Sequence, residues 1–251
     1  KLVGDSSITK NNLVLEIGPG NGILTQELIK KAKEVIAIEL DPYWHKKLEH
    51  KFRDKRNLIL HSGDFLTYSL PQLPYKVFAN IPFAIEGKII RRLIEAPNPP
   101  QDCYLVVMDK LARRLVAKNI PNMFSALHQP WFDFSIVHWF KPTDFSPVPN
   151  VQAALFRFSL KKEILLPFSW RKEYQNFIKL GYGQGRTIRF NLKKKFSSSL
   201  VDQALHACSI RQKTKPSHIP THQWIRLFKS LSGRQDSNLR PHGPKPRTLA
   251  I

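Results

Sequence analysis

The residues Asn80-Ile81-Pro82-Phe83 place a side-chain amide, a proline-stiffened backbone and an aromatic ring side by side. These types suit chemistry on the exocyclic amine of adenine, which is a poor nucleophile because its lone pair is delocalised into the ring. The Asn80 oxygen and a backbone carbonyl near Ile81 can accept both N–H bonds of such an amine. Pro82 restricts the residue before it, and Phe83 can stack on the base. We predict a catalytic site here; the alternative is a strand-ending turn punctuated by Asn and Pro.

A second wall for the base is predicted downstream. A base inside a helix cannot reach such a pocket, so it must be flipped out or lie in a single-stranded loop. Phe145 begins a run with prolines at positions 147 and 149, and we predict that it closes the other side of the base. A buried hydrophobic contact is the competing role for Phe145.

A glycine-rich loop follows the first predicted strand and opens a helix, with Glu16 ahead of Gly18, Gly20 and Gly22. Glycines at this place let the backbone turn sharply and let a ligand approach closely. The spacing is GxGxG after an acid, whereas nicotinamide-binding loops use GxGxxG. We therefore predict an S-adenosylmethionine site rather than a hydride-transfer site. A simple strand-to-helix turn is the alternative.

Two acids support the same cofactor site. Glu39 ends the second predicted strand, where its carboxylate can accept hydrogen bonds from both ribose hydroxyls, and Leu40 is assigned to the same site. Asp64 follows the third strand, placed to accept a hydrogen bond from the cofactor adenine, with Phe65 as an apolar wall. Each acid alone could be a helix cap or a surface group. Together with the glycine loop they fall at successive strand ends.

The charge is strongly positive, +21 over 251 residues, which predicts a polyanionic partner. Residues 1–160 hold 21 Lys/Arg against 15 Asp/Glu, a surplus of 6, whereas residues 161–251 hold 19 against 4, a surplus of 15. The last third is therefore predicted to bind nucleic acid, and a solvated basic face is the alternative.

The remaining composition narrows the class of protein. Cys103 and Cys208 lie far apart without CxxC spacing, so neither a disulfide framework nor a zinc site is predicted, and no metal is expected. The sequence has no apolar run of about 20 residues and no signal pattern at its start. We expect a cytoplasmic protein with no membrane partner.

Hydrophobic patterning predicts an α/β fold in which a mostly parallel, Rossmann-like sheet is covered by helices. The predicted strands are 13–17, 35–40, 58–61, 76–79 and 104–108, followed by an antiparallel pair at 132–140 and 153–160. Helices are predicted after the first two strands and at 85–95, 174–181, 200–207 and 224–231. The resulting domains are a catalytic domain at 1–160, a basic helical RNA-binding domain at 161–232 and a disordered tail at 233–251.

These motifs together resemble the ribosomal RNA adenine dimethylase family. The matching elements, in family order, are EIGPGNG at 16–22, AIELD at 37–41, GDF at 63–65, NIPF at 80–83 and FxPxPxV at 145–151. The resemblance implies successive methyl transfers from S-adenosylmethionine to one rRNA adenine, with Gly18, Glu39, Asp64 and Asn80 as contacts. It also implies a Gln-Asn-Phe or Gln-Asn-Leu segment, upstream of Lys1, that helps to close the pocket.

Within that family, Asn-Ile-Pro in place of Asn-Leu-Pro resembles the erythromycin-resistance methyltransferases, as does the small basic C-terminal domain. That branch implies a monomer that modifies 23S rRNA and confers resistance to macrolide, lincosamide and streptogramin B antibiotics. A 16S rRNA dimethyltransferase of ribosome biogenesis is the alternative enzyme. A non-catalytic RNA-binding factor on the same scaffold is the alternative of a different class.

Overall fold

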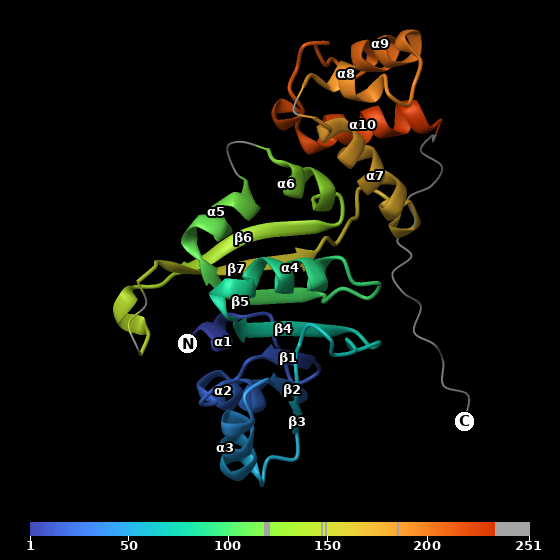
Figure 1. The fold of residues 1–251 in the computed structure, drawn as a ribbon. Helices are drawn as coiled ribbons and strands as arrows, with labels where there is room; N and C mark the ends of the chain where they lie inside the picture. The colour runs from blue at the N-terminus through green and yellow to red at the C-terminus, as the bar shows by residue number, and fades with distance from the viewer. Residues whose placement is uncertain (118–120, 147, 149, 185, 234–251) are drawn as a thin grey trace, which may run out of the picture. The chain divides into compact units, whose positions relative to one another are not determined.

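The computed structural model contains a seven-stranded sheet, ordered β3-β2-β1-β4-β5-β7-β6 (Figure 1). The structure describes residues 1–117, 121–146, 148, 150–184 and 186–233. The strands are β1 (Leu13–Ile17), β2 (Glu34–Glu39), β3 (Leu58–Ser62), β4 (Tyr75–Asn80), β5 (Asp102–Met108), β6 (Phe132–Trp139) and β7 (Ala153–Leu160).

Helices connect these strands and continue after the last one. The α-helices are α1 (Leu2–Asp5), α2 (Ile23–Lys31), α3 (Pro42–Phe52), α4 (Glu86–Ile94), α5 (Asp109–Val116), α6 (Met123–His128), α7 (Arg171–Tyr182), α8 (Ile188–Leu192), α9 (Ser198–Ala207) and α10 (Thr221–Ser232). Single 3₁₀ turns are η1 (Phe83–Ile85), η2 (Pro142–Asp144), η3 (Phe168–Trp170) and η4 (Pro216–His218). The sequence patterns did not reveal α1, α5, α6 or α8, which have between four and eight residues.

Parallel pairing brings the carboxyl ends of several strands to one edge of the sheet. β1 pairs in parallel with both β2 and β4, β2 with β3, and β4 with β5. β7 pairs antiparallel with β5, and the Phe140 N–H donates to the Ala153 carbonyl at 3.0 Å where β6 meets β7. The predicted α/β fold, with an antiparallel pair at the sheet edge, is confirmed.

The core on one face of the sheet contains side chains from α1, α2 and α3 together with Phe78 and Tyr104, which stack at 5.3 Å. In α2, Leu28 and Ile29 are buried. Ile23, an apolar residue of the same helix, is 66% exposed. It is the first residue of the helix, directly after the Gly22 turn and ahead of the turn that packs on the core.

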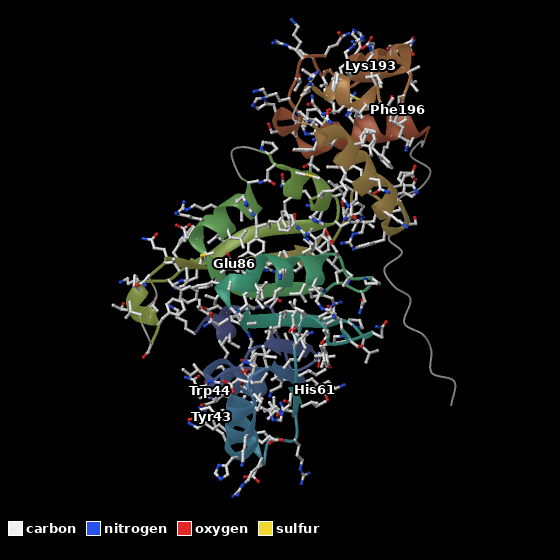
Figure 2. All side chains as sticks on the ribbon, in the orientation of Figure 1. Tyr43, Trp44, His61, Glu86, Lys193 and Phe196 are labelled. Atoms are coloured by element: carbon white, nitrogen blue, oxygen red, sulfur yellow. The ribbon has the colours of Figure 1, made fainter. Side chains whose placement is uncertain are left out.

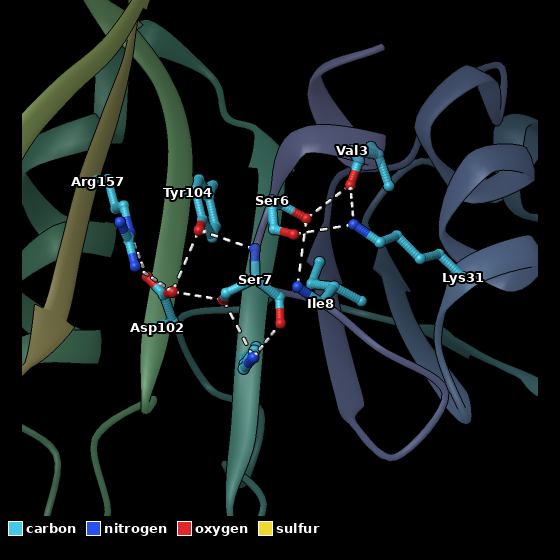
Figure 3. Close-up of polar contacts among 9 residues, drawn as sticks. Val3, Ser6, Ser7, Ile8, Lys31, Asp102, Tyr104 and Arg157 are labelled. Carbon is cyan, nitrogen blue, oxygen red and sulfur yellow. Dashed lines mark hydrogen bonds and ion pairs between the residues drawn. The ribbon is translucent and has the colours of Figure 1, made fainter.

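A polar network joins the N-terminal segment to the sheet (Figure 3). Asp102, at the start of β5, is buried and accepts two hydrogen bonds of 2.8 Å from the Arg157 guanidinium on β7. The Ser7 and Tyr104 hydroxyls donate to the same carboxylate. On α2, Lys31 Nζ donates to backbone carbonyls in and just after α1. Charge-assisted bonds of this kind hold the segment before β1 in one place.

The chain divides into two compact units, unit 1 with Lys1–Val116 and Asp133–Leu160, and unit 2 with Ala117–Phe132 and Lys161–Ile251. The segment 117–132, which contains α6, therefore groups with the later helices. The roles predicted for 1–160 and 161–232 stay predictions. The tail predicted at 233–251 lies outside the described residues from position 234 onward. Within the described ranges, no helix is long and apolar enough to cross a membrane.

Unit 2 has an aromatic core of its own. Tyr174 and Phe177 on α7 and Trp224 and Phe228 on α10 are buried, with edge-on contacts of 5.3 Å for Tyr174–Phe228 and 6.0 Å for Phe177–Trp224. A Cβ at Gly181 would lie 2.5 Å from the Trp224 ring, so α7 and α10 approach closely only because this residue is glycine. The unit is therefore a packed body that can present its surface residues rigidly.

Candidate active site

The glycine loop after β1 has the left-handed backbone that its composition predicts. The φ angles of Gly18, Gly20 and Gly22 are +64°, +54° and +78°. A Cβ at Gly18 or Gly20 would meet nothing within 4 Å, so space for a ligand lies beside them. A Cβ at Gly22 would lie 2.7 Å from the Phe52 ring of α3, so this glycine makes room for the protein itself.

Glu39 contacts the glycine loop directly. Its side chain is buried at the end of β2, where Oε2 accepts a hydrogen bond from the Gly20 N–H and Oε1 accepts one from the Asp41 N–H, both at 2.9 Å. A carboxylate has about four lone-pair sites, so each oxygen keeps one for a ligand hydroxyl. Leu40, the next residue, is 66% exposed. The arrangement fits a ribose held at this strand end.

Glu16 lies at the end of β1 with 1% exposure. Neither carboxylate oxygen makes a well-formed hydrogen bond with the described residues, and the same holds for the nearby Thr25 hydroxyl. Burial raises the pKa of the Glu16 carboxyl to about 8, although proximity to Thr25 lowers it in part and Glu39 raises it further. A buried acid next to Thr25 and an open loop fits a ligand that brings further donors.

Asp64 and Phe65 follow β3. The Asp64 side chain is exposed, and its Oδ1 accepts a hydrogen bond from the Leu66 N–H at 2.8 Å, which leaves the second oxygen for a ligand amine. Phe65 is buried, and the Arg92 guanidinium of α4 lies 5.7 Å from the centre of its ring. The structure places both residues at the predicted strand end without testing their roles.

The loop predicted to bind the target base begins where β4 ends. The Asn80 side chain is exposed and makes no hydrogen bond with the described residues, so its oxygen can accept from a ligand. Ile81 is buried at 2% exposure, Pro82 has extended backbone with φ −61° and ψ 121°, and Phe83 packs partly buried against the core. The Asn80 side chain therefore projects from a backbone that the buried Ile81 and partly buried Phe83 side chains anchor to the core.

Glu86, which sequence reasoning missed, holds the other end of this loop (Figure 2). Its buried carboxylate lies in the first turn of α4, and Oε2 accepts a hydrogen bond from the Met108 N–H at 2.9 Å. At the near end, Asn80 pairs with Val106 of the same strand β5. Burial raises the pKa of the Glu86 carboxyl. An acid three residues after Phe83 was the only sequence signal.

Phe145 lies on the loop between β6 and β7. It is partly buried, packs against the core and contacts Phe140 at 5.2 Å between ring centres. The Lys141 N–H donates to the Asp144 carboxylate at 2.7 Å, which orders the turn before it. Pro147 and Pro149 of the same run lie outside the described residues. The structure is compatible with both roles weighed for Phe145, and its contact with a base stays a prediction.

The sheet order brings the predicted site residues to one edge. β3, β2, β1 and β4 are neighbours, so Asp64, Glu39, the glycine loop and Asn80 follow their carboxyl ends in that order. Among these groups, the described hydrogen bonds join Glu39 to Gly20 directly. In parallel sheets, ligands bind outside the carboxyl ends of the strands at such an edge. The edge can hold a nucleoside-like cofactor beside a planar base.

Comparisons with known proteins bear on this site. Residues 1–232 match the family described as Ribosomal RNA adenine dimethylase. Ribosomal RNA small subunit methyltransferase A from Nostoc sp. is 33% identical over 248 residues, which cover 92% of this chain and 91% of that protein. An rRNA adenine N-6-methyltransferase from Saccharopolyspora erythraea is 28% identical over 235 residues, which cover 93% of this chain and 61% of that protein. The crystal structure of 23S rRNA methyltransferase ErmE has a TM-score of 0.80 at 28% identity, covering 92% of this chain and 95% of that one.

Proposed function

The chain belongs to the ribosomal RNA adenine dimethylase family, and we propose that its target is an N6 amine of adenine in 23S rRNA. It is an S-adenosylmethionine-dependent rRNA adenine N6-methyltransferase. The observation that carries the proposal is the exposed, unpaired Asn80 amide, which lies at the same sheet edge as the open glycine loop. This edge therefore gathers the residues assigned to the methyl donor and to the base.

The residues around Asn80 perform the proposed transfer. The Asn80 side-chain oxygen and a backbone carbonyl near Ile81 accept the two N–H bonds of the target amine, which draws its lone pair out of the ring. Phe83 and Phe145 stack on the base and keep the amine in line with the donated methyl group. The amine becomes acidic as the new N–C bond forms, so its proton passes to solvent without a strong general base.

The cofactor site fits S-adenosylmethionine, which supplies an electrophilic methyl group on a sulfonium when bound. Gly18 and Gly20 leave open space for its close approach, and Glu39 keeps one lone-pair site on each oxygen for the ribose hydroxyls. The buried Glu16 carboxyl lies at the end of β1, just before this loop, and is proposed to contact the cofactor. Asp64, Phe65 and Leu40 are proposed to surround the adenine of the cofactor.

Unit 2 is proposed to bind the RNA. Residues 161–251 hold a surplus of 15 positive charges, and Lys193-Lys194-Lys195 contribute a dense group of them. Contacts between such cations and phosphates release counterions, which provides affinity without reading the sequence. We infer that the protein acts as a monomer in the cytoplasm, where ribosomal RNA is available.

Two observations favour 23S rRNA as the target. The motif contains Ile81, in the form Asn-Ile-Pro, and the likeness to 23S rRNA methyltransferase ErmE extends over 92% of the chain at a TM-score of 0.80. Under this proposal, methylation near the peptidyl-transferase centre blocks macrolide, lincosamide and streptogramin B antibiotics. The expected phenotype is resistance in cells that express the gene.

The second candidate target is 16S rRNA. The relative from Nostoc sp., named for the small subunit, is 33% identical over 92% of this chain, compared with 28% for the relative from Saccharopolyspora erythraea. Under this alternative, the enzyme takes part in ribosome biogenesis and confers no resistance.

Separate incubations with protein-free 23S and 16S rRNA and a labelled methyl donor distinguish the two targets. We expect label in 23S rRNA, and a block to primer extension at one adenine, since two methyl groups on N6 prevent base pairing. Label confined to 16S rRNA would replace the proposal with the second candidate. Absence of label from both would contradict the activity itself.

A further inference from the structure

One stretch of unit 2 presents an aromatic ring on a basic surface. In and around α8, Ile188, Asn191 and Leu192 are buried, whereas Phe190 is 39% exposed. Arg186, Phe190 and Lys194 recur every fourth residue, and the first and last of them are also exposed. Phe190 lies within α8, whereas Arg186 lies just before this helix and Lys194 just after it. We call Arg186, Phe190 and Lys194 the α8 platform.

The two cations of the α8 platform lie against the ring. The Arg186 guanidinium carbon is 4.6 Å from the centre of the Phe190 ring, and Lys194 Nζ is 5.6 Å from it. Cations within about 6 Å of an aromatic centre are attracted by the electrons of the ring. Phe190 is therefore a surface aromatic with positive charge over its ring. Lys193 and Phe196, which follow it in the same unit, are labelled in Figure 2.

The charges of Arg186 and Lys194 are available to a ligand, whereas the charge of Arg189 is not. Arg189, in the same helix, donates two hydrogen bonds to the Asp202 carboxylate of α9, at 2.5 and 2.6 Å. Among the described residues, no ion pair joins Arg186 or Lys194 to an acid. Arg189 therefore stabilises unit 2 through its ion pair, whereas Arg186 and Lys194 face outward. The amino-acid composition alone does not distinguish these two kinds of cation.

The ring is also held in place by its own helix. Buried Asn191 donates from Nδ2 to the Gly181 carbonyl at 2.7 Å, and the Ile188 N–H donates to the Thr214 carbonyl at 2.9 Å. The Thr187 hydroxyl caps the helix by accepting from the Phe190 N–H. A platform that is ordered before binding loses little conformational entropy when a ligand arrives.

We propose that the α8 platform binds a single-stranded stretch of the rRNA substrate, with one base stacked on Phe190 and the flanking phosphates on Arg186 and Lys194. The proposal rests on the rRNA substrate of the proposed function and adds a base contact outside the active site. Every base has a π-face, so a lone exposed ring between cations suits RNA of any sequence. A membrane surface would instead require a broad apolar face beside the cations.

Fluorescence anisotropy with a short single-stranded oligoribonucleotide, measured on the whole chain over a range of salt concentrations, tests the α8 platform. We expect Phe190→Ala to weaken binding about tenfold at every salt concentration, because stacking is not an ionic contact. Phe190→Trp, which keeps an aromatic ring at this position, should bind the oligoribonucleotide as tightly as the wild type does. Arg186→Ala and Lys194→Ala should each reduce the slope of log affinity against log salt by about 0.7, the value for one phosphate of a single strand.

Leu200→Ala is the matched control, since Leu200 is an exposed apolar residue (41%) on α9 of the same unit. It should bind as the wild type does. Equal affinity of Phe190→Ala and wild type would overturn the platform while leaving the proposed methyl transfer intact. Loss of binding to anionic lipid vesicles, with RNA affinity unchanged, would overturn it in favour of a membrane. A wild-type protein that binds no RNA would overturn both proposals.

Discussion

Asn80 presents an exposed amide at the end of β4, and the proposed chemistry depends on its side-chain oxygen. In Asn80→Ala, one of the two acceptors for the target amine is lost, so we expect the rate of methyl transfer to fall by about 100-fold or more. The measurement is incorporation of labelled methyl into rRNA at saturating cofactor. Asn11→Ala, an exposed asparagine ahead of β1, is the control. An Asn80→Ala enzyme as fast as the wild type would contradict the assigned role.

Glu16 gives the free protein a specific dependence on pH. Its pKa rises from 4.5 to about 8 on folding because the carboxyl is buried. Between these values the folded state keeps a proton that the unfolded chain has lost. The contribution of Glu16 to stability therefore falls as pH rises through this window, by about 1 kcal/mol per pH unit.

Glu16→Gln removes the titrating group, so the free energy of unfolding should change less with pH in the variant than in the wild type. Urea denaturation of the cofactor-free protein at several pH values across the window measures the difference. Parallel pH profiles for the two proteins would show that Glu16 is not buried in its neutral form.

At the scale of elements, β5 holds both ends of the loop that carries the base site. Asn80 pairs with Val106, and the Glu86 carboxylate accepts from the Met108 N–H. In Glu86→Ala the far end of the loop is released, and we expect kcat to fall by up to about 100-fold while KM for the cofactor stays unchanged, since small displacements are costly to in-line transfer.

Glu86→Gln keeps an acceptor oxygen and should recover most of the rate that Glu86→Ala loses. Glu95→Ala, an exposed acid at the end of the same helix, controls for loss of charge. A purely structural role would lower the unfolding free energy of Glu86→Ala without changing kcat of the folded enzyme, and that result would contradict the role proposed for Glu86.

Asp102 joins the N-terminal segment to β5 and β7. Asp102→Ala leaves Arg157 and two hydroxyls without their acceptor, so we expect the free energy of unfolding to fall by about 3 kcal/mol. Urea denaturation measures this change. Asp54→Ala is the control, because the Asp54 side chain is 86% exposed. A loss no larger in Asp102→Ala than in Asp54→Ala would show that the network does not stabilise the fold.

The strand-end motifs were predictable because they are local. Glu39 and Asn80 each end an apolar run, and the parallel sheet then brings such ends to one edge. The Glu86–Met108 bond was not predictable, since it joins residues 22 positions apart through a fold that the sequence does not display. The α8 platform was not predictable for the same reason. Arg189 pairs with Asp202, 13 positions away, and only the folded structure shows that Arg189 is paired in this way whereas, within the described ranges, Arg186 and Lys194 are not.

At the scale of the whole molecule, the sequence predicted a basic C-terminal domain at 161–232. It did not predict that residues 117–132 belong to the same compact unit. Segment 117–132 groups with unit 2 through contacts such as that of Trp131 Nε1, which donates to the Leu166 carbonyl at 2.7 Å. The chain leaves unit 1 at residue 117, contributes a segment to unit 2 and returns to unit 1 at residue 133. The local hydrophobic periodicity of the sequence does not reveal such a change of unit. The contact with RNA therefore has to be sought over unit 2 as the structure defines it.

The affinity of the whole protein for rRNA should depend steeply on salt. The surplus of 15 positive charges in residues 161–251 predicts several phosphate contacts. If about six phosphates are bound, affinity falls by about 1,000-fold between about 50 and about 200 mM salt. Filter binding at several salt concentrations measures the slope. A flat response would contradict the assignment of RNA binding to the basic surface.

The central claim is that this chain places methyl groups on N6 of an rRNA adenine. Mass spectrometry of the nucleosides from protein-free rRNA, digested after incubation with the enzyme and S-adenosylmethionine, tests it most directly. We predict N6-methyladenosine and N6,N6-dimethyladenosine in reactions with the wild type, and at least about 100-fold less of both in the same time with Asn80→Ala. Methyl groups found on another base or on ribose, or no methylated nucleoside at all, would contradict the account.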